Sequence, residues 1–466
     1  MVLVEKKSAA GGLYISAAHK SSGKTTISLG LCAALKDRQI TIQPFKKGPD
    51  FIDPLWLKQA SSRACYNLDF FTSSEQEIKN LYSSKSLDAD ITIIEGNKGL
   101  YDGMDLHGAD SNAALANLLD LPVVLVINTQ GITRGIAPLL LGYQGFDKAP
   151  QIAGVILNNV AGSRHESKLI SVVEEYTDIP VIGSVRRSSS LVIDERHLGL
   201  MPSNEASESE AIITAIKKTV EAQVDLDNFI QLARPPALQG FSSVIDLQEE
   251  KTNKVKIGIF KDAAFGFYYE DDLEKISHFG GELIEINALQ DASLPEVDGL
   301  FIGGGFPETH MQQLAANSEL MRAVKTFIEN DGVVYAECGG LMYLAQSLTW
   351  NGNECKMSGV IPGNIEMSEK PQGRGYIKLV ETDQHPWPGK NTAVLSAHEF
   401  HYSALTDLPD DAVFAYQVKR GCGIDGAHDG FVYKNLLANY AHMRNVGSNH
   451  WAERFVNKII EVKGNN

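Results

Sequence analysis

Short apolar runs alternate with helical stretches through the first half of the chain. Six runs have strand length: 13–17, 40–44, 91–95, 123–128, 152–157 and 180–183. Between most of them, apolar residues recur at helical spacing, as they do from Thr25 to Leu35. Continuous apolar runs are typical of strands that are buried on both faces, and strand–helix alternation is typical of a parallel sheet between helices. We therefore expect an α/β fold with a parallel sheet.

The alternation weakens between about residues 233 and 253. ARPPALQGF and the polar EEKTNK in this segment have the composition of a linker. A second α/β series begins at 255–260 and continues beyond residue 300. Because 466 residues are too many for one compact core, two domains are the natural division. The sequence predicts one domain over 1–240 and a second over 254–466.

Composition and charge disfavour several classes of protein. Hydrophobic residues make up 43% and charged residues 21% of the chain, which is ordinary globular composition. A formal net charge of −16 disfavours binding to nucleic acid or to an anionic membrane. The most apolar run, LPVVLVI, is too short to cross a bilayer, and the N-terminus lacks an apolar core of signal-peptide length. Five scattered cysteines indicate neither a metal site nor a disulfide framework, so we expect a cytoplasmic protein.

A phosphate-binding loop is predicted between the first strand and the first helix. The loop SAAHKSSGKTT contains Gly23, Lys24, Thr25 and Thr26, the core of a P-loop. In such a loop backbone N–H groups surround a phosphate, the lysine neutralises it and the hydroxyl of Thr25 can bind Mg²⁺. Ala18 stands where the usual loop has its first glycine, and a chance Gly-Lys-Thr at a helix start is the alternative. The strand–loop–helix context favours an ATP site.

Two acidic segments are expected to face this site. They are PFKKGPDFIDP and EGNKGLYDG, and the second directly follows a strand. In doubly wound sheets, residues beyond the carboxyl ends of the strands face the ligand crevice. We expect Asp50 and Glu95 to reach Mg²⁺ and the phosphates, and Asp53 and Asp102 to lie nearer a substrate carboxylate. The alternative for each aspartate is a turn-forming role beside Gly and Pro.

A nucleophilic cysteine is predicted in the second half. VVYAECGG places Cys338 between an apolar strand and the helix-like LMYLAQSL. The two following glycines permit a sharp turn that projects the sulfur, and the N-terminus of a helix stabilises a thiolate. A lone cysteine is usually a small buried apolar residue, but the glycine pair at a strand–helix junction favours catalysis.

Partners for Cys338 are also predicted. GGGFPE follows another strand, and the backbone N–H groups of Gly304 and Gly305 are suited to an oxyanion hole. A nucleophilic cysteine needs a base, usually a histidine from elsewhere in the chain. The candidates are His398, His401 and His442.

These motifs resemble those of the cobyrinic acid a,c-diamide synthase family. The similarity spans essentially the whole chain and includes the P-loop, PFKKGPDFIDP, EGxxGLYDG, ERHLGL, GGGFPE, AECGGLMYL and HEFHYS. The resemblance implies a dethiobiotin-synthetase-like ATPase domain followed by a class I-type glutaminase domain. It implies Cys338 as the nucleophile and His442 as its base. It also implies ATP and Mg²⁺ as cofactors and glutamine and a tetrapyrrole acid as substrates, and it leaves a homodimer as one candidate assembly.

Two departures qualify the resemblance. Ordinary class I glutaminases carry a glutamate two residues after the histidine, and the family lacks it, which implies a Cys–His dyad. The family more often has another histidine at that position, where this chain has Arg444. Asn97 and Lys98 stand where most cobyrinate enzymes have bulky apolar residues. With RGIAPLLLGYQ, they resemble a subgroup that amidates sirohaem for dissimilatory sulfite reductase. The related cobyric acid synthases have a segment that resembles FKPQNMSNN where this chain has GPDFIDP. That family is therefore disfavoured.

The resemblance implies ATP- and glutamine-dependent amidation of the a and c acetates of cobyrinate. Lys24 and Lys46 would stabilise charge on the transferred phosphoryl group. Arg196 and His197 are candidate anchors for other substrate carboxylates, unless they are surface basic residues. The same chemistry on sirohaem is one alternative. A P-loop switch ATPase that acts as a binding module is a second, and a scaffold with an inactive glutaminase half is a third.

Overall fold

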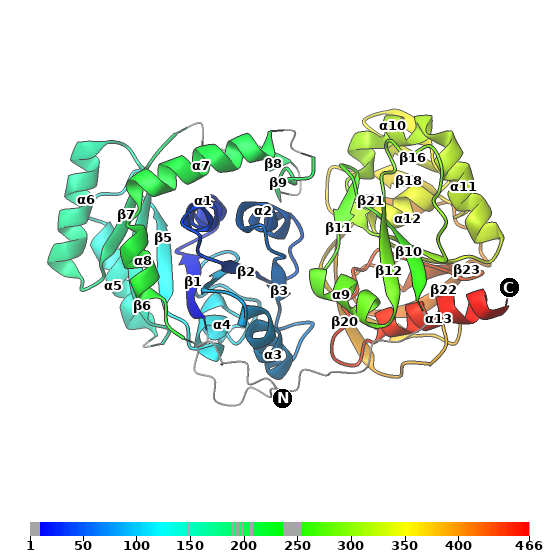
Figure 1. Ribbon diagram of the computed structural model, residues 1–466, viewed down its shortest axis with the longest axis horizontal. Coiled ribbons are helices and arrows are strands. Elements are labelled where there is room, and N and C mark those ends of the chain that lie inside the picture. The colour runs from blue at the N-terminus through cyan, green and yellow to red at the C-terminus, as the bar shows by residue number, and fades with distance from the viewer. Residues whose placement is uncertain are drawn as a thin grey trace. The chain divides into compact units, whose positions relative to one another are not determined.

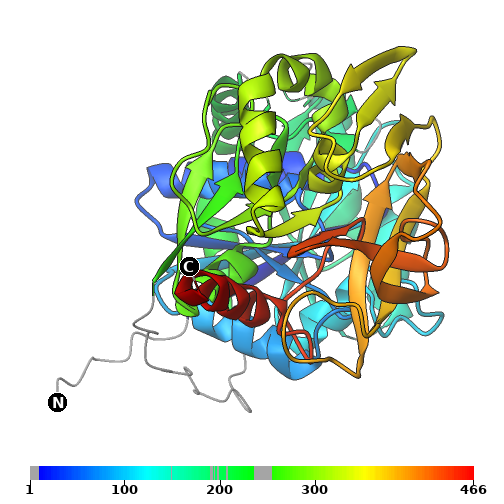
Figure 2. The same cartoon turned by 90° about the vertical axis from the view of Figure 1, so that its right-hand side faces the viewer.

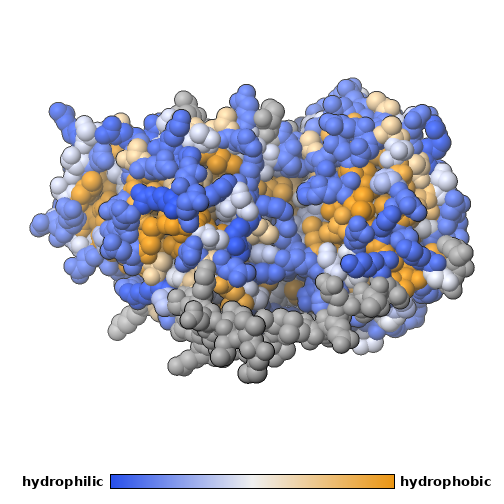
Figure 3. Space-filling view, in the orientation of Figure 1, coloured by the Kyte–Doolittle hydropathy of each residue, from blue (hydrophilic) through white to orange (hydrophobic). Residues whose placement is uncertain are grey.

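The chain folds as two compact units, Met1–Ile245 and Asp246–Asn466. The computed structural model, drawn in Figure 1, describes residues 10–147, 149–188, 191, 193, 195–196, 199–205, 208–235 and 254–465. Along these residues, no helix is both long enough and apolar enough to span a membrane. The face drawn in Figure 3 is covered mainly by hydrophilic residues, with smaller apolar areas between them.

The first unit alternates strands and helices. Its main strands are β1 (Gly11–Ala17), β2 (Ile42–Lys47), β3 (Tyr66–Leu68), β4 (Ile91–Glu95), β5 (Val123–Asn128), β6 (Ile152–Val160) and β7 (Val181–Arg186). Its helices are α1 (Lys24–Asp37), α2 (Ile52–Ser61), α3 (Glu75–Ser86), α4 (Asn112–Leu118), α5 (Ile136–Phe146), α6 (Ser163–Tyr176), α7 (Ser209–Gln223) and α8 (Leu226–Leu232). A short ribbon pairs β8 (Glu195–Arg196) with β9 (Gly199–Leu200).

The main strands of this unit form one parallel sheet between two layers of helices, in the order β3-β2-β4-β1-β5-β6-β7. Side chains alternate across each strand. Leu13 and Ile15 of β1 therefore join the apolar core beneath α1, α2, α7 and α8. Tyr14 joins the core beneath α3, α4, α5 and α6. The predicted α/β fold with a parallel sheet is confirmed.

The second unit contains a larger mixed sheet. Its strands are β10 (Val255–Phe260), β11 (Phe265–Phe267), β12 (Gly281–Ile286), β13 (Gly299–Ile302), β14 (Gly304–Gly305), β15 (Val333–Glu337), β16 (Ser347–Trp350), β17 (Asn353–Lys356), β18 (Asn364–Met367), β19 (Gly373–Glu381), β20 (Val394–His401), β21 (Ser403–Thr406), β22 (Val413–Arg420), β23 (His428–Tyr433) and β24 (Leu436–Asn439). Its helices are α9 (Glu270–His278), α10 (Met311–Ala316), α11 (Ser318–Glu329), α12 (Gly339–Leu344) and α13 (Trp451–Asn465), with a 3-10 turn at Pro307–His310.

The sheet order in this unit is β12-β10-β13-β15-β24-β23-β22-β19-β20, and the pairs from β12 to β24 are parallel. Val334 and Ala336 of β15 pack with α10, α11 and α12 on one face. Val333 and Tyr335 pack with α9 and α13 on the other face. Figure 2 shows the red α13 and the yellow-green helices of this unit. The strands β15 and β24 are therefore buried on both sides, and their carboxyl ends lie next to each other.

Candidate active sites

Cys338 occupies a strained turn between β15 and α12. Its backbone has φ 48° and ψ −99°, a conformation that costs free energy in a residue with a side chain. Its N–H donates to the carbonyl oxygen of Asn439 at 2.7 Å. A Cβ added at Gly340 would lie 2.1 Å from the carbonyl oxygen of Ile302, so only glycine fits there. This turn has the properties predicted for a nucleophile elbow.

His442 lies three residues beyond the end of β24 and contacts Cys338. Burial by itself would lower the pKa of His442, but hydrogen bonds to Cys338 and Glu337, and the charges of both, raise it to about 10. A histidine in hydrogen-bond contact with a cysteine is the arrangement that activates a cysteine nucleophile. Among the three candidate bases, the structure thus brings His442 to Cys338.

His398 and His401 support this site without replacing its base. The backbone N–H of His442 donates to the carbonyl oxygen of His398 at 2.7 Å, and the N–H of His398 donates back at 3.3 Å. The ring of His401 stacks on Tyr440 with ring centroids 3.8 Å apart. Burial lowers the pKa of His398 to about 3 and the pKa of His401 to about 4, so both stay neutral. The HEFHYS motif therefore fixes the backbone beside His442.

Glu337 also belongs to this cluster, although it was not among the site residues predicted from the sequence. Its Oε2 lies 3.3 Å from Nδ1 of His442. Its Oε1 accepts hydrogen bonds from the hydroxyl of Tyr335 at 2.6 Å and from the N–H of Met443 at 2.9 Å. The AECGG motif places Glu337 directly before the nucleophile, but its contact with His442 follows from the pairing of β15 with β24. A carboxylate thus lies beside the two residues of the expected dyad.

Arg444 has a packing role that explains its presence two residues after His442. Its side chain is 1% exposed, forms an ion pair with Asp271 of α9 and lies with its guanidinium carbon 4.8 Å from the centre of the Tyr269 ring. Asp272, the next residue of α9, accepts the N–H of Asn445 at 2.9 Å. These contacts tie the segment that carries His442 to α9.

Gly304 and Gly305 form β14, next to the cysteine turn. A Cβ added at Gly304 would lie 2.6 Å from Cε1 of His442, and one added at Gly305 would lie 2.0 Å from the carbonyl oxygen of Ala264. A Cβ at Gly339 would lie 3.0 Å from the backbone nitrogen of Gly305. The absence of side chains therefore lets the base, the turn after Cys338 and this backbone meet, as an oxyanion hole beside a nucleophile requires.

The predicted P-loop joins β1 to α1 in the first unit. Gly23 has φ 90°, and a Cβ there would lie 2.1 Å from Nδ2 of Asn158, which donates to the carbonyl oxygen of Ser22 at 2.9 Å. Lys24 donates to the carbonyl oxygen of Lys98 at 2.6 Å, and burial lowers the pKa of Lys24 to about 8. A bound phosphate would stabilise the charged form of this lysine. Asn158 was not predicted.

Thr25 begins α1 together with Lys24 and Thr26, and its side chain joins a buried ionic cluster. Its hydroxyl donates to Oε1 of Glu95 at 2.7 Å and lies 3.4 Å from Oδ2 of Asp53. Nζ of Lys46 contacts the same two carboxylates, at 2.9 Å and 2.5 Å respectively. Burial by itself would lower the pKa of Lys46, but both carboxylates raise it well above its usual value.

Asp53 contacts Thr25 and Lys46 directly, whereas Asp50 has other hydrogen-bond partners. Oδ1 of Asp50 accepts the backbone N–H groups of Ile52 at 2.9 Å and of Asp53 at 3.0 Å, which is a cap on the start of α2. The turn-forming alternative thus describes Asp50 well. The metal-ligand role of Asp50 and the substrate role of Asp53 stay predictions, and we propose that Asp53, which lies 3.4 Å from the hydroxyl of Thr25, also reaches the metal.

The oxygen atoms around Thr25 fit Mg²⁺ in the presence of a nucleotide. Within the described part of the chain, no group of three or more His, Cys, Asp or Glu side chains could hold a metal ion by itself. Oε2 of Glu95 is nevertheless buried without a hydrogen-bond partner. Mg²⁺ prefers oxygen ligands and is usually held by one or two carboxylates together with phosphates and water. Thr25, Glu95 and Asp53 are therefore the residues that would hold it.

The loop after β4 is positioned by Asn112, which the sequence analysis missed. Nδ2 of Asn112 donates to the carbonyl oxygens of Asn97 and Gly99, both at 2.6 Å, and Oδ1 accepts the hydroxyl of Tyr14 at 2.8 Å. Asp102 is exposed and accepts the N–H of Gly99 at 2.9 Å. A single amide at the start of an Ala- and Leu-rich helix carries no distinctive sequence signal.

The two predicted substrate anchors after β7 stay predictions. Arg196 belongs to the short strand β8, and His197 lies outside the described residues.

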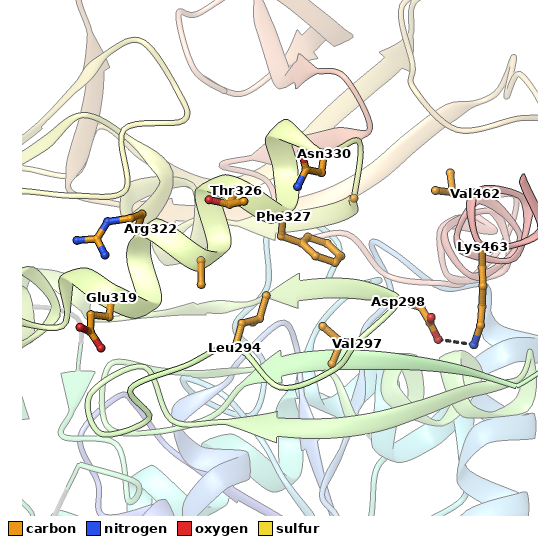
Figure 4. A pocket seen from close by; sticks show the side chains of 12 residues that line it. Leu294, Val297, Asp298, Glu319, Arg322, Thr326, Phe327, Asn330, Val462 and Lys463 are labelled. Atoms are coloured by element: carbon orange, nitrogen blue, oxygen red, sulfur yellow. Dashed lines mark hydrogen bonds and ion pairs between the residues drawn. The ribbon is translucent and has the colours of Figure 1, made fainter. Parts of the chain in front are cut away.

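The second unit also contains a cavity of about 740 Å³, whose lining residues are drawn in Figure 4. Its lining includes Leu294, Phe327 and the ion pair between Asp298 and Lys463. Gly332, also on its lining, precedes β15, whereas Cys338 follows that strand. The cavity and the nucleophile are therefore at opposite ends of β15.

Comparison with known proteins matches both units. Residues 256–449 match the family described as CobB/CobQ-like glutamine amidotransferase domain, and residues 11–193 match an AAA domain. A cobyrinate a,c-diamide synthase of Magnetococcus marinus is 43% identical over 94% of this chain and 95% of its own length. Proteins of the same name from Methanosarcina barkeri and Archaeoglobus fulgidus are each 38% identical; the matches cover 95% and 97% of this chain and 95% and 98% of those proteins.

The choice of base can be tested by replacing each histidine. We expect His442→Ala to slow release of glutamate from glutamine by roughly 10²- to 10⁴-fold, the usual effect of losing a general base. His401→Ala is expected to act much less, because His401 stacks on Tyr440 and stays neutral. Steady-state glutaminase rates of the two purified variants check this, once thermal unfolding curves have shown that both variants are folded. The reverse ranking would show that His442 is not the base.

Proposed function

The chain belongs to the cobyrinate a,c-diamide synthase family, and from this we propose that it uses ATP and glutamine to amidate the a and c acetate carboxylates of cobyrinate. The observation that carries the proposal is the presence of two complementary sites in one chain. One pairs Cys338 with His442, and the other surrounds Thr25 of a P-loop with carboxylates. A glutaminase releases ammonia, and an ATPase activates a carboxylate to accept it.

In the glutaminase half-reaction, the thiolate of Cys338 attacks the side-chain amide carbon of glutamine. Backbone N–H groups at Gly304 and Gly305 stabilise the resulting oxyanion. His442 delivers its proton to the departing nitrogen as the C–N bond breaks, which releases ammonia and leaves a thioester. Water, deprotonated by His442, then attacks the thioester carbon, and the C–S bond breaks to give glutamate and free Cys338.

In the synthetase half-reaction, an oxygen of the substrate carboxylate attacks the γ-phosphorus of ATP. The bond to the β-phosphate oxygen breaks, which yields an acyl phosphate and ADP. Ammonia then attacks the acyl carbon, phosphate leaves, and the nitrogen loses a proton to give the amide. Lys24 and Lys46 supply positive charge to the transferred group. Mg²⁺, held by Thr25, Asp53 and Glu95, would neutralise phosphate charge.

The two alternatives without amidation have less support. A P-loop switch ATPase that acts as a binding module has no use for a cysteine held in a strained turn beside a protonated histidine. A scaffold with an inactive glutaminase half has no use for Glu337 beside that histidine. Strained residues and buried ionic groups of this kind cost stability. They therefore cluster at catalytic sites, where the chemistry requires them.

The tetrapyrrole itself is the finer part of the proposal. Whole-chain relatives named cobyrinate a,c-diamide synthase support cobyrinate. Lys98 favours sirohaem as the alternative, because it places a cation where most cobyrinate enzymes have a bulky apolar residue. Its side chain is exposed, and its carbonyl oxygen accepts a hydrogen bond from Lys24. Lys47 ends β2 at the same edge of the sheet, and burial lowers its pKa, so a carboxylate bound beside it would stabilise its charge. Both cations suit a substrate with several carboxylates.

The two-site mechanism predicts separable activities. We expect Cys338→Ala to abolish glutamine-dependent amidation, because the nucleophile is lost. Amidation with an ammonium salt and ATP should continue, because carboxylate activation occurs in the other unit. Product formation with each nitrogen source measures both. A folded variant that loses both activities would exclude the two-site mechanism.

The P-loop lysine is expected to serve only the synthetase half-reaction. Lys24→Ala should abolish amidation with glutamine and with ammonium, because both routes need the acyl phosphate. Part of the basal glutaminase should persist. The same product assay, together with glutamate release, checks this. Ammonium-dependent amidation near the wild-type rate would remove Lys24 from the phosphate site.

Substrate identity is tested by mass spectrometry of products formed from ATP, glutamine and either cobyrinate or sirohaem. We expect cobyrinate to gain two amides, each replacing a carboxylate. Conversion of sirohaem but not of cobyrinate would favour the alternative. Lys98→Met, measured in the same assay, should raise the Michaelis constant for the tetrapyrrole and leave basal glutaminase unchanged. Unchanged constants for each tetrapyrrole would exclude Lys98 as a carboxylate anchor.

A further inference from the structure

We propose that Glu337 is a positioning residue of the glutaminase site, and that its carboxylate holds the ring of His442 with Nδ1 protonated and Nε2 available to Cys338. The inference rests on the proposed glutaminase half-reaction. It extends the expected Cys–His dyad to a three-residue arrangement whose carboxylate comes from the nucleophile's own strand.

The contact arises from the sheet order. Glu337 ends β15, and its register partner in the parallel neighbour β24 is Asn439. His442 follows three residues later, so the turn after β24 brings its ring over the end of β15. Alternation along the strand places Tyr335 on the same side as Glu337. Its hydroxyl donates to Oε1 of Glu337 at 2.6 Å.

The two carboxylate oxygens have different partners. Oε1 is occupied by two donors, the hydroxyl of Tyr335 and the N–H of Met443. Oε2 faces Nδ1 of His442 at 3.3 Å. An ionised carboxylate can only accept hydrogen bonds, so Nδ1 must carry the proton. The remaining ring nitrogen, Nε2, is then the one that exchanges a proton with the nucleophile.

The position of the ring agrees with this assignment. Nε2 and Cε1 of His442 are the ring atoms nearest to Gly304, at 3.5 Å and 2.6 Å from the Cβ that a substitution there would add. Gly304 belongs to the predicted oxyanion backbone. Hydrogen bonds to Cys338 and to Glu337 together raise the pKa of His442. The imidazole therefore lies between the carboxylate and the side where glutamine reacts.

The carboxylate also compensates for the absence of the usual acidic residue. The position two residues after His442 holds Arg444, which is buried and pairs with Asp271. In catalytic histidines a carboxylate on the far nitrogen fixes the tautomer and stabilises the imidazolium without itself being protonated. Glu337 supplies that carboxylate from β15. The proton on Nδ1 stays there, and only the proton between Sγ of Cys338 and Nε2 moves.

Glu337→Gln tests the proposal, because it keeps the shape of the side chain and removes its charge. We expect glutamate release from glutamine to fall by between about 10-fold and 10⁴-fold, the range seen when such a carboxylate is neutralised. Ammonium-dependent amidation should stay at the wild-type rate. Glutamate release requires no tetrapyrrole, so a wrong substrate assignment does not affect this test. Absence of ammonium-dependent amidation in the wild type would count against the proposed function and not against the role of Glu337.

The pH profile separates positioning from a merely structural role. Glu337 raises the pKa of His442, so the imidazolium persists to higher pH in the wild type. Without the carboxylate, His442 should lose its proton at lower pH, and the alkaline limb of kcat/KM for glutamine should shift to lower pH. Tyr335→Phe is the matched control: it removes one donor to Glu337 but keeps the charge, so the limb should stay in place.

Two results would overturn the proposal. One is a folded Glu337→Gln variant whose glutaminase rate stays within about threefold of the wild type, well short of the usual loss. The other is an unshifted alkaline limb in that variant. If Glu337→Gln does not fold, Glu337→Asp decides instead. It keeps the charge on a shorter side chain, so a reduced rate with the limb near its wild-type position supports the proposal, and an unreduced rate contradicts it.

Discussion

Neighbouring parallel strands end at a common edge of a sheet, and both candidate sites depend on that constraint. In the first unit, β2, β4 and β1 bring Lys46, Glu95 and the P-loop to one edge. In the second unit, β15 and β24 bring Cys338 and the segment carrying His442 to one edge. Residues that are about 50 to 100 positions apart in the chain meet because the strands that carry them are hydrogen-bonded neighbours.

Burial of paired charges is the second physical feature that the sites share. Lys46 is enclosed with Asp53 and Glu95, and His442 with Glu337. Removing a charge from water is costly, and an opposite charge with good hydrogen bonds offsets that cost. Loss of one partner would leave the other buried and unpaired. Such clusters keep the reacting groups in place between turnovers, which is how a preorganised site lowers a barrier.

Local motifs could be interpreted from the sequence because their function lies in consecutive residues. A P-loop requires a strand, a loop and a helix in that order. Its phosphate-binding residues, Gly23 through Thr26, are consecutive at the start of the helix. A nucleophile elbow requires small residues directly after Cys338. Asp50 and Asp53 lie in one motif, and the sequence does not show which partners each one has. The orientation of the first turn of α2 directs Asp53 to Thr25 and Lys46, whereas Asp50 accepts the backbone N–H of Ile52.

By itself, the sequence determined the α/β fold, the two motifs that carry the chemistry and the pairing of a cysteine with one of three histidines. Apolar periodicity and local turn chemistry are properties of short segments, so they can be recognised without coordinates. The resemblance already indicated His442 as the base; only the tertiary structure showed that His442 contacts Cys338, that Glu337 lies beside it and that Arg444 packs against α9. Each of these contacts depends on which strands and helices are neighbours. The order of the strands and the packing of the helices are set in turn by the need to bury both faces of the sheet.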